Sequence, residues 1–372
     1  MDEEVWKDVK NIIVFGYGRQ AKKVIEKFSE YFTIEAIIDN DKNKWGKLII
    51  NDLRICSLRD AEQIIKKKTA KIIVMAMGRN YGEIAKSLIA LGLTEYVDFI
   101  RHEMFITKWF SKFRDKCFIL KTDLFVTNVC NLNCEKCASF VPYIRKKEQI
   151  NSDIIKHTLD DYFKICDYVF SMDIFGGEPF LYEHLKTIIE YIGSCYSLKI
   201  GYIGIITNGF IPPSNDLLEV MSKYGIGVSI SDYSKNSIEE EKIDALCMRL
   251  EKKGIRYFRN RNLEWRDLGF PVEYKIRTSE KALMHRKACG NMCHVLYDGR
   301  LFYCAAAAAA YHGGLFNKME GDYISLDNDT KKDKLMDFVL GNVNVTYQGF
   351  CSVCDGYGSD NPKVIPAAEQ YE

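Results

Sequence analysis

The chain has 372 residues, 47% of them hydrophobic, and this length exceeds what one ordinary core needs, so we expect two or three domains. Its 52 basic and 51 acidic residues leave a net charge of +1, which gives no electrostatic reason to expect nucleic acid as a partner. The sequence opens without the basic start and apolar core of a signal peptide and contains no run of about 18 apolar residues, so we expect a cytoplasmic protein with no membrane partner.

The first 100 residues predict alternating strands and helices. A strand at residues 11–15 leads into the turn Gly16-Tyr17-Gly18 and a helix to residue 28, and a strand at 33–38 ends at Asp39. Glycines at Gly16 and Gly18 let backbone N–H groups approach a phosphate, and Asp39 is placed to accept from a ribose hydroxyl. With helices near 58–67 and 81–91 and strands near 71–76 and 96–100, residues 1–100 predict a Rossmann-like domain. It either binds a nucleotide or nucleotide-sugar or serves as a scaffold.

Residues 101–116 are basic and aromatic and predict a connecting helix. The favoured interpretation is a linker packed on its neighbours, and a membrane-surface helix is the alternative. From residue 117 the alternation resumes, which predicts a parallel sheet whose strand ends carry the site. Strands are predicted at residues 118–127, 168–175, 199–207, 225–230 and 254–258, and helices at 152–166, 182–195, 214–224 and 237–252.

Three of the thirteen cysteines, Cys130, Cys134 and Cys137, follow the first of these strands in the sequence CNLNCEKC. In a reducing compartment, metal ligation, catalysis or burial explains cysteines better than a disulfide framework. Thiolates hold iron–sulfur clusters, and a loop that supplies three of them leaves one iron of a cubane open to a small chelating molecule. A structural zinc site needs a fourth ligand, and no paired CxxC or CxxH unit lies nearby. Iron is therefore favoured, with a partial zinc knuckle as the alternative.

Gly176-Gly177-Glu178-Pro179 comes at the end of the next predicted strand. Two glycines let the backbone come close to a ligand, and a carboxylate is able to accept from an ammonium group. The CxxxCxxC and GGEP motifs, in this order, resemble those of the radical SAM superfamily.

That resemblance implies a partial (β/α)6 barrel over residues 117–275. It implies a 4Fe-4S cluster on Cys130, Cys134 and Cys137, chelated by the amino and carboxyl groups of S-adenosylmethionine, with the GGEP motif contacting the methionyl amino group. Reductive cleavage of that cofactor to a 5'-deoxyadenosyl radical is the implied reaction, and a flavodoxin or ferredoxin-type protein is the implied electron donor.

Two further residues are assigned to S-adenosylmethionine by the same resemblance. Asn208 and Ser231 stand at the ends of the third and fourth predicted strands, where similar proteins contact the ribose and carboxylate of the cofactor. One position departs from the family pattern. The residue before the third cysteine is usually aromatic and packs near the adenine, but here it is Lys136, so that contact must be altered or replaced.

A second set of cysteines lies in residues 276–372. Asp298-Gly299 between apolar runs predicts a hairpin turn that brings Cys289 and Cys304 together, and Cys351 and Cys354 form a CxxC pair. This pattern resembles the auxiliary-cluster domain of the SPASM and twitch branch of the superfamily. Because no cysteine follows Cys354, the shorter twitch form with a single auxiliary 4Fe-4S cluster is implied. A structural zinc site on the same four thiolates is the alternative.

The reaction expected is radical abstraction of a substrate hydrogen by an oxidoreductase. An auxiliary cluster that accepts an electron favours two-electron oxidation, whereas a donor thiol favours epimerisation. Cys293 is left over, as a buried structural thiol or as a hydrogen-atom donor like that of radical SAM epimerases.

The substrate is inferred from the domain that precedes the barrel. A Rossmann-like domain, in place of the winged-helix domain that captures leader peptides, favours a sugar, nucleotide sugar or small polyol, with peptide maturation as the alternative. A non-enzymatic Fe-S electron carrier or scaffold is an alternative of another class, but it has no use for an open three-cysteine site beside GGEP.

Overall fold

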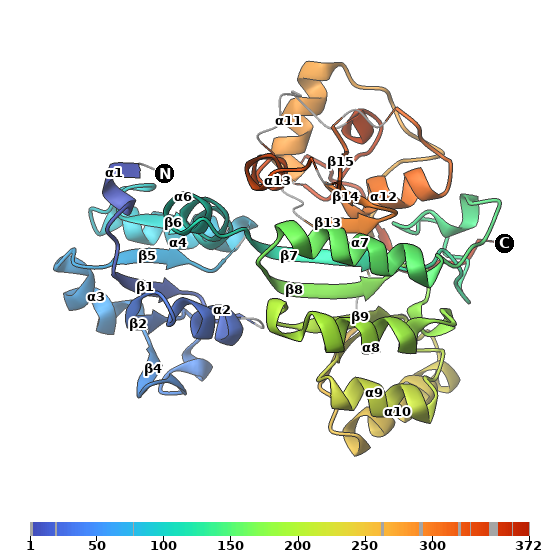
Figure 1. Cartoon of the computed structure of the whole chain (residues 1–372), viewed down its shortest axis with the longest axis horizontal. Coiled ribbons are helices and arrows are strands. Elements are labelled where there is room, and N and C mark those ends of the chain that lie inside the picture. The colour runs from blue at the N-terminus through green and yellow to red at the C-terminus, as the bar shows by residue number, and fades with distance from the viewer. Residues whose placement is uncertain are drawn as a thin grey trace. The chain divides into compact units, whose positions relative to one another are not determined.

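A computed structural model describes residues 3–18, 21–76, 78–261, 264–289, 293–318, 321–327, 329–341, 349–358 and 360–371. The chain divides into two compact units, Met1–Leu120 and Lys121–Glu372. Each unit combines helices with a largely parallel sheet, as the alternation of apolar runs and amphipathic segments predicts (Figure 1). Within the described residues, no helix combines the length and the apolar character needed to cross a membrane.

The first unit is built on a six-stranded sheet with the strand order β3-β4-β2-β1-β5-β6. Parallel pairing joins β1 to β2 and β5, β2 to β4, and β5 to β6, whereas β3 and β4 pair antiparallel. The strands are β1 (Asn11–Phe15), β2 (Thr33–Ile38), β3 (Leu48–Ile50), β4 (Leu53–Cys56), β5 (Lys71–Val74) and β6 (Phe99–Arg101). The helices are α1 (Glu3–Trp6), α2 (Ala21–Phe28), the short 3-10 helix η1 (Lys42–Lys44), α3 (Leu58–Lys66) and α4 (Gly78–Ala90).

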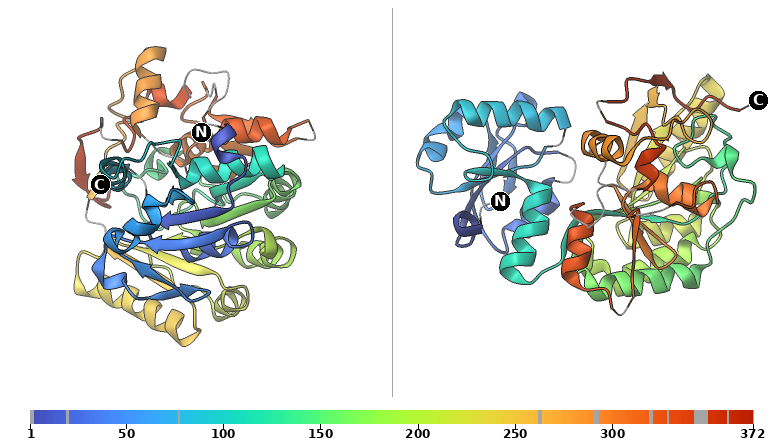
Figure 2. Two further views of the ribbon diagram at one scale, coloured as in Figure 1. Left: turned by 90° about the vertical axis from the view of Figure 1, so that its left-hand side faces the viewer. Right: turned by 90° about the horizontal axis from the view of Figure 1, so that it is seen from above.

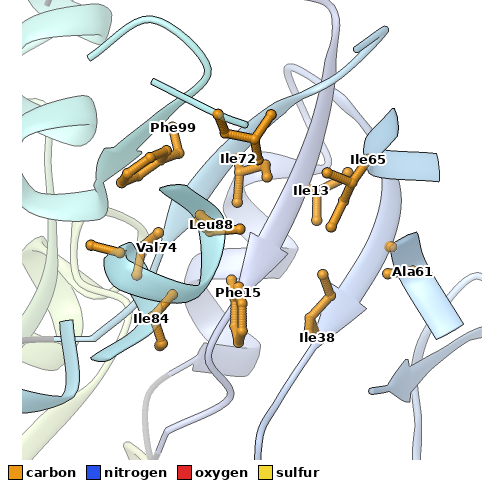
Figure 3. Close-up of a cluster of buried hydrophobic side chains, with 13 residues drawn as sticks. Ile13, Phe15, Ile38, Ala61, Ile65, Ile72, Val74, Ile84, Leu88 and Phe99 are labelled. Atoms are coloured by element: carbon orange, nitrogen blue, oxygen red, sulfur yellow. The ribbon is translucent and has the colours of Figure 1, made fainter. Parts of the chain in front are cut away.

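One face of this sheet is covered by α3 and α4. Alternate strand residues such as Ile13 and Phe15 point to the same face, where they meet Ile65 of α3 and Leu88 of α4 (Figure 3). All four side chains are buried, Leu88 completely. Ser57 caps α3 with a reciprocal capping box to Asp60, which satisfies two of the free N–H groups at its start.

The other face is covered by aromatic side chains from the segment that the sequence predicts as a linker. This segment forms α5 (His102–Met104), a π-helix η2 (Phe105–Trp109) and α6 (Phe110–Arg114). Phe105, Trp109 and Phe110 are fully buried and contact Phe28 of α2 and Phe32. Helices therefore lie on both sides of the sheet (Figure 2, right), and residues 102–114 belong to the core of the first unit.

The second unit contains an eight-stranded sheet with the order β11-β10-β9-β8-β7-β13-β14-β15. Its strands are β7 (Phe118–Phe125), β8 (Tyr168–Phe175), β9 (Ile203–Thr207), β10 (Gly227–Asp232), β11 (Tyr257–Arg261), β13 (His294–Tyr297), β14 (Arg300–Phe302) and β15 (Tyr323–Ser325). Parallel pairs join β8 to β9, β9 to β10, β10 to β11 and β7 to β13. Parallel strands place their carboxyl ends at one edge, so the loops after β7, β8, β9 and β10 meet there.

Helices connect these strands and pack beside the sheet, as Figure 1 shows for α7 and α8. The helices and short helical turns of the second unit are η3 (Val141–Tyr143), α7 (Ser152–Ile165), η4 (Pro179–Leu181), α8 (Leu185–Cys195), η5 (Ser197–Lys199), α9 (Asn215–Lys223), α10 (Ser237–Lys252), α11 (Ser279–Cys289), α12 (Ala305–His312), α13 (Lys332–Val339) and η6 (Gly349–Ser352).

The predicted hairpin at Asp298-Gly299 is confirmed. Strands β13 and β14 pair antiparallel with Tyr297 opposite Arg300, and both turn residues have positive φ, 48° and 68°. Strand β13 also pairs with β7. The region predicted as a third domain, residues 276–372, therefore contributes strands to the same sheet as residues 117–275. A separate two-stranded sheet joins β12 (Glu264–Arg266) to β16 (Val364–Pro366).

The core of the first unit gives a direct test of the packing. Replacing Leu88 by Ala removes a fully buried side chain and leaves a cavity, so we expect a loss of about 3 kcal/mol in the free energy of unfolding, measured in urea. The neighbouring Ile89, 54% exposed on the same helix, is the matched control, and Ile89→Ala should change stability by less than about 0.5 kcal/mol. Equal losses in the two variants would contradict this packing.

Candidate functional site

A cavity of about 500 Å³ opens at the carboxyl edge of the second sheet. It brings together residues that are far apart in the sequence and that the motifs single out. The predicted residues on its walls are Cys130, Cys134, Cys137, Gly176, Gly177, Asn208 and Ser231. Lys136 also lines the cavity, whereas Glu178 and Pro179 are not among the described lining residues.

The two glycines are packed against the backbone that leads into the cysteine loop. Gly177 donates its N–H to the carbonyl of Thr127 at 2.7 Å, and the N–H of Glu178 donates to the carbonyl of Val129 at 2.8 Å. A Cβ atom on Gly176 or Gly177 would stand 2.2 Å from the carbonyl oxygen of Thr127 or Val129. Only glycine permits this approach, which fixes the cysteine loop to the end of β8.

The side chain of Glu178 holds the loop after β9 in place. Its carboxylate accepts from the hydroxyl of Thr207 at 2.8 Å and from the backbone N–H groups of Asn208 and Phe180 at 2.9 and 3.1 Å. Glu178 is completely buried, and burial raises its pKa to about 7 against these hydrogen bonds. It is therefore the backbone of the two glycines, and not this carboxylate, that borders the cavity.

The three thiols lie near hydrogen-bond donors, with Cys134 buried and Cys130 and Cys137 partly buried. Burial raises the pKa of Cys130 to about 12 and also raises the pKa of Cys134 and Cys137. The backbone N–H of Leu132 donates to Cys130 Sγ at 3.4 Å, and the side-chain amide of Gln370 donates to Cys134 Sγ at 3.3 Å. Buried thiols of this kind become thiolates when iron binds them, so the donor set fits an iron–sulfur cluster.

In the described part of the chain, no three His, Cys, Asp or Glu side chains converge closely enough to hold one metal ion. A cubane has a different requirement, because each thiolate binds a different iron atom.

Asn208 and Ser231, which the sequence assigns to the cofactor, both line the cavity. Asn208 donates its side-chain amide to Asn131 Oδ1 at 2.9 Å and lies 3.9 Å from Cys130 Sγ, so it supports the cysteine loop. Ser231 is in β10, two residues before Tyr233, whose ring meets Trp265 of β12 edge to face at 5.3 Å. Tyr233 and Trp265 both line the cavity. Sequence reasoning missed them because no motif marks either residue.

Lys136 faces a carboxylate from another element. Its ammonium lies 3.4 Å from Asp267, which is nearly buried and follows β12. Asp267 raises the pKa of Lys136 against the effect of burial. The cavity wall therefore carries one partner of an ion pair at Lys136, and its aromatic side chains include Tyr233 and Trp265.

The second cysteine set surrounds a smaller cavity, which Cys289, Cys304, Cys351 and Cys354 all line together with His285 and Arg286. Cys304 is the N-cap of α12 and accepts from the N–H of Ala307 at 3.4 Å, so the positive end of this helix favours a thiolate there. The N–H groups of Gly356 and Tyr357 donate to Cys354 and Cys289 at 3.3 and 3.5 Å.

Burial raises the pKa of three thiols in this set, that of Cys304 to about 12, and it also raises the pKa of Cys351 and of Cys354. The alanine run packs α12 tightly, with Ala306 to Ala310 at most 3% exposed. Tyr357 lines both cavities, so the cavities of the two cysteine sets are neighbours.

Cys293 lies among buried polar side chains of the sheet. Its thiol donates to Asp123 at 2.6 Å, and Lys121 pairs with Asp173 at 2.8 Å and with Asp123 at 3.4 Å. Burial and the charge of Asp123 raise the pKa of the thiol. Cys293 is not among the described residues that line either cavity.

In the predicted nucleotide motif of the first unit, the Asp39 carboxylate already has hydrogen-bond and ion-pair partners within the chain. Asp39 accepts from the N–H groups of Tyr17 at 2.6 Å and Asp41 at 2.8 Å, and the ammonium of Lys44 lies 3.2 Å away. Gly16 has a φ of 109° and donates its N–H to the carbonyl of Ile38. Gly18 has open space around it, while Arg19 and Gln20 of the same motif lie outside the described residues.

A family model and three solved structures resemble parts of the chain. Residues 124–273 match the family model of the radical SAM superfamily, and this match covers less than half of the chain. No curated protein sequence matches the chain.

Streptococcus suis SuiB bound to S-adenosylmethionine is 16% identical over 50% of this chain and 38% of its own, with a TM-score of 0.31. Histidine-tagged anSMEcpe with bound AdoMet is 13% identical over 65% of this chain and 89% of its own, with a TM-score of 0.40. RSP, a Rex-family repressor, in complex with β-NADH is 21% identical over 25% of this chain and 45% of its own, with a TM-score of 0.21.

The chain spans well under two thirds of SuiB. TM-scores of this size establish neither a shared fold nor a shared substrate.

The close backbone contacts of Gly177 predict that adding a single methyl group at this position displaces the cysteine loop. Gly177→Ala should push the residues after Val129 out of place, because its Cβ would overlap a backbone carbonyl that has no freedom to move away. We expect faster amide hydrogen exchange in peptides covering residues 127–137 of the cluster-free protein. Gly82→Ala, in α4 with no atom within 4 Å of its Cβ, is the control and should leave those peptides unchanged. Unchanged exchange in Gly177→Ala would contradict the packing.

Proposed function

We propose that the protein is a radical SAM enzyme that oxidises or epimerises a sugar, nucleotide sugar or small polyol. The observation that carries this proposal is the meeting of Cys130, Cys134 and Cys137 with Gly176 and Gly177 on the walls of one cavity. Three thiols and a glycine backbone at the carboxyl edge of a parallel sheet suit an open-iron cluster and a small chelating cofactor.

The bound 4Fe-4S cluster and S-adenosylmethionine supply a 5'-deoxyadenosyl radical. In the proposal, the three cysteines hold the cluster, and the Gly176-Gly177 backbone borders the methionyl end of the cofactor. Glu178 keeps this backbone and the loop after β9 together, and Asn208 and Ser231 border the ribose and carboxylate. Tyr233 and Trp265 offer the aromatic surface that Lys136 does not.

We further assign Cys289, Cys304, Cys351 and Cys354 to one auxiliary 4Fe-4S cluster of the twitch type. Its cavity shares Tyr357 with the first, so an electron acceptor there would stand close to the reacting substrate. With that cluster as electron acceptor, this arrangement would favour two-electron oxidation of the substrate. Cys293 would serve epimerisation as a hydrogen-atom donor, but its thiol is engaged with Asp123 instead.

The domain layout belongs to the same proposal: a Rossmann-like domain over residues 1–100, a connecting segment at 101–116 that packs into the core of that unit, a partial (β/α)6 barrel over 117–275 and an auxiliary-cluster region over 276–372 whose strand β13 joins the barrel sheet. The parallel order of the first sheet supports the first assignment. This domain favours a sugar-type substrate over a peptide. Because Asp39 is paired with Lys44, nucleotide binding there requires that pair to open.

Turnover of S-adenosylmethionine tests the proposed enzyme. The reconstituted protein with dithionite should release 5'-deoxyadenosine and contain about eight iron atoms per chain, as two cubanes require. Cys134→Ala should abolish 5'-deoxyadenosine, whereas Cys354→Ala should lower iron to about four while cofactor cleavage continues. Cys195→Ala, which changes an exposed thiol at the end of α8, is the control and should match the wild type.

A fully reconstituted wild-type protein that forms no 5'-deoxyadenosine would overturn the proposal. If 5'-deoxyadenosine forms, sugar and peptide libraries then compare the substrate classes by product mass. A product two mass units lighter indicates oxidation, and a product of equal mass that takes up solvent deuterium indicates epimerisation.

A further inference from the structure

The segment of residues 364–371 lies against two walls of the first cavity. Its β16 strand pairs antiparallel with β12, whose three residues, Glu264, Trp265 and Arg266, all line the cavity. A few residues later the same segment reaches the cysteine loop. There the N–H of Glu135 donates to the carbonyl of Glu369 at 2.8 Å, and the N–H of Tyr371 donates to the carbonyl of Asn133 at 2.7 Å.

These backbone bonds form an antiparallel bridge in which Gln370 stands opposite Cys134. Ala368 is buried and has a φ of 56°, so the chain makes a tight bend just before this bridge. The ring of Tyr371 meets Tyr143 edge to face, and the hydroxyl of Tyr143 donates to the carbonyl of Glu135 at 2.9 Å. The cysteine loop is thus held from outside by a segment more than 200 residues away, as the separation of 236 positions between Gln370 and Cys134 shows.

The side chain of Gln370 uses both ends of its amide in this bridge. Its Oε1 accepts from the N–H of Asn133 at 2.8 Å, and its Nε2 donates to Cys134 Sγ at 3.3 Å and to the carbonyl of Ala368 at 2.9 Å. The amide is therefore fixed from two sides with one N–H aimed at the sulfur. The nearer donor to Cys130 is the backbone N–H of Leu132 at 3.4 Å, with the Asn208 amide at 3.9 Å, whereas the donor to Cys134 is the Gln370 side chain, which a substitution removes directly.

We propose that Gln370 is a positioning residue for the cluster ligand Cys134 and makes the open-iron cluster easier to reduce. The inference deepens the proposed function and rests on it. A hydrogen bond to a ligating sulfur stabilises the extra negative charge of the reduced cluster, so it raises the reduction potential. The Oε1 contact to Asn133 meanwhile fixes the loop residue next to the ligand.

Two variants separate these two contacts. Gln370→Leu removes both the donor and the acceptor at similar size, whereas Gln370→Glu keeps an oxygen for Asn133 but replaces the donor with a negative charge near the sulfur. Glu369→Gln is the matched control, since only the backbone carbonyl of Glu369 takes part in the bridge.

The first readout is the midpoint potential of the cluster whose EPR signal changes when S-adenosylmethionine is added. We expect the potential to fall from wild type to Gln370→Leu and to fall again in Gln370→Glu, and to stay at the wild-type value in Glu369→Gln. The second readout is amide exchange at Asn133 in the cluster-free chain. It should be about fivefold faster in Gln370→Leu, the effect of one lost hydrogen bond, and close to wild type in Gln370→Glu.

The outcomes distinguish the inference from the function on which it rests. If the wild type assembles no cluster that responds to S-adenosylmethionine, the proposed function fails. If that cluster forms and its potential is the same in wild type, Gln370→Leu and Gln370→Glu, the role of Gln370 is refuted while the enzyme proposal stands. Unchanged exchange at Asn133 in Gln370→Leu would likewise refute the positioning contact.

Discussion

The close approach of Gly176 and Gly177 to the backbone of residues 127–129 is the constraint on which the candidate site depends. Two backbone hydrogen bonds and two positions without room for a Cβ hold the end of β8 against the start of the cysteine loop. The buried carboxylate of Glu178 extends this contact to the loop after β9. Three strand ends are thereby fixed to one another, and the cavity that the three cysteines line is the space they leave.

Polar groups buried around the cavity accept hydrogen bonds from other parts of the chain, which offsets the loss of their contacts with water. Glu178 has three donors, and the thiols of Cys130 and Cys134 each receive an amide. Neutral thiols tolerate burial, and iron would supply the positive charge that their thiolate forms need. The second cysteine set follows the same principle with the N-terminus of α12 and the amides after Cys354.

The sequence predicted those helices and strands that are marked by apolar runs or amphipathic spacing within the element itself. The bounds of β1, β2, β8 and α10 agree with the predicted ranges because apolar runs and amphipathic spacing mark them clearly. The predicted strand at 199–207 starts later, at Ile203, because residues 197–199 form a 3-10 turn. The cysteine and glycine motifs were visible for the same reason, since each is a short run with fixed spacing.

The rest of the site depends on contacts that no local pattern records. Trp265 and Tyr357 line the cavities from elements distant in sequence, and Gln370 reaches the cysteine loop from the segment that follows β16. The ion pair between Asp39 and Lys44 is likewise a tertiary feature of a motif that the sequence presents as open. The segment 101–116 has the composition of a linker, but its aromatic residues are a core once Phe28 and Phe32 are placed beside them. Whether such a segment is a linker or part of a core depends on the residues that pack against it, and its own composition does not show this.

The central claim is that Cys130, Cys134 and Cys137 hold a cluster with one iron open to S-adenosylmethionine. The most direct measurement is the EPR spectrum of the reduced Cys354→Ala variant, which lacks one ligand of the auxiliary set, before and after addition of S-adenosylmethionine. The account predicts one 4Fe-4S signal whose g-values change when the cofactor binds. A 4Fe-4S signal that S-adenosylmethionine leaves unchanged would contradict it.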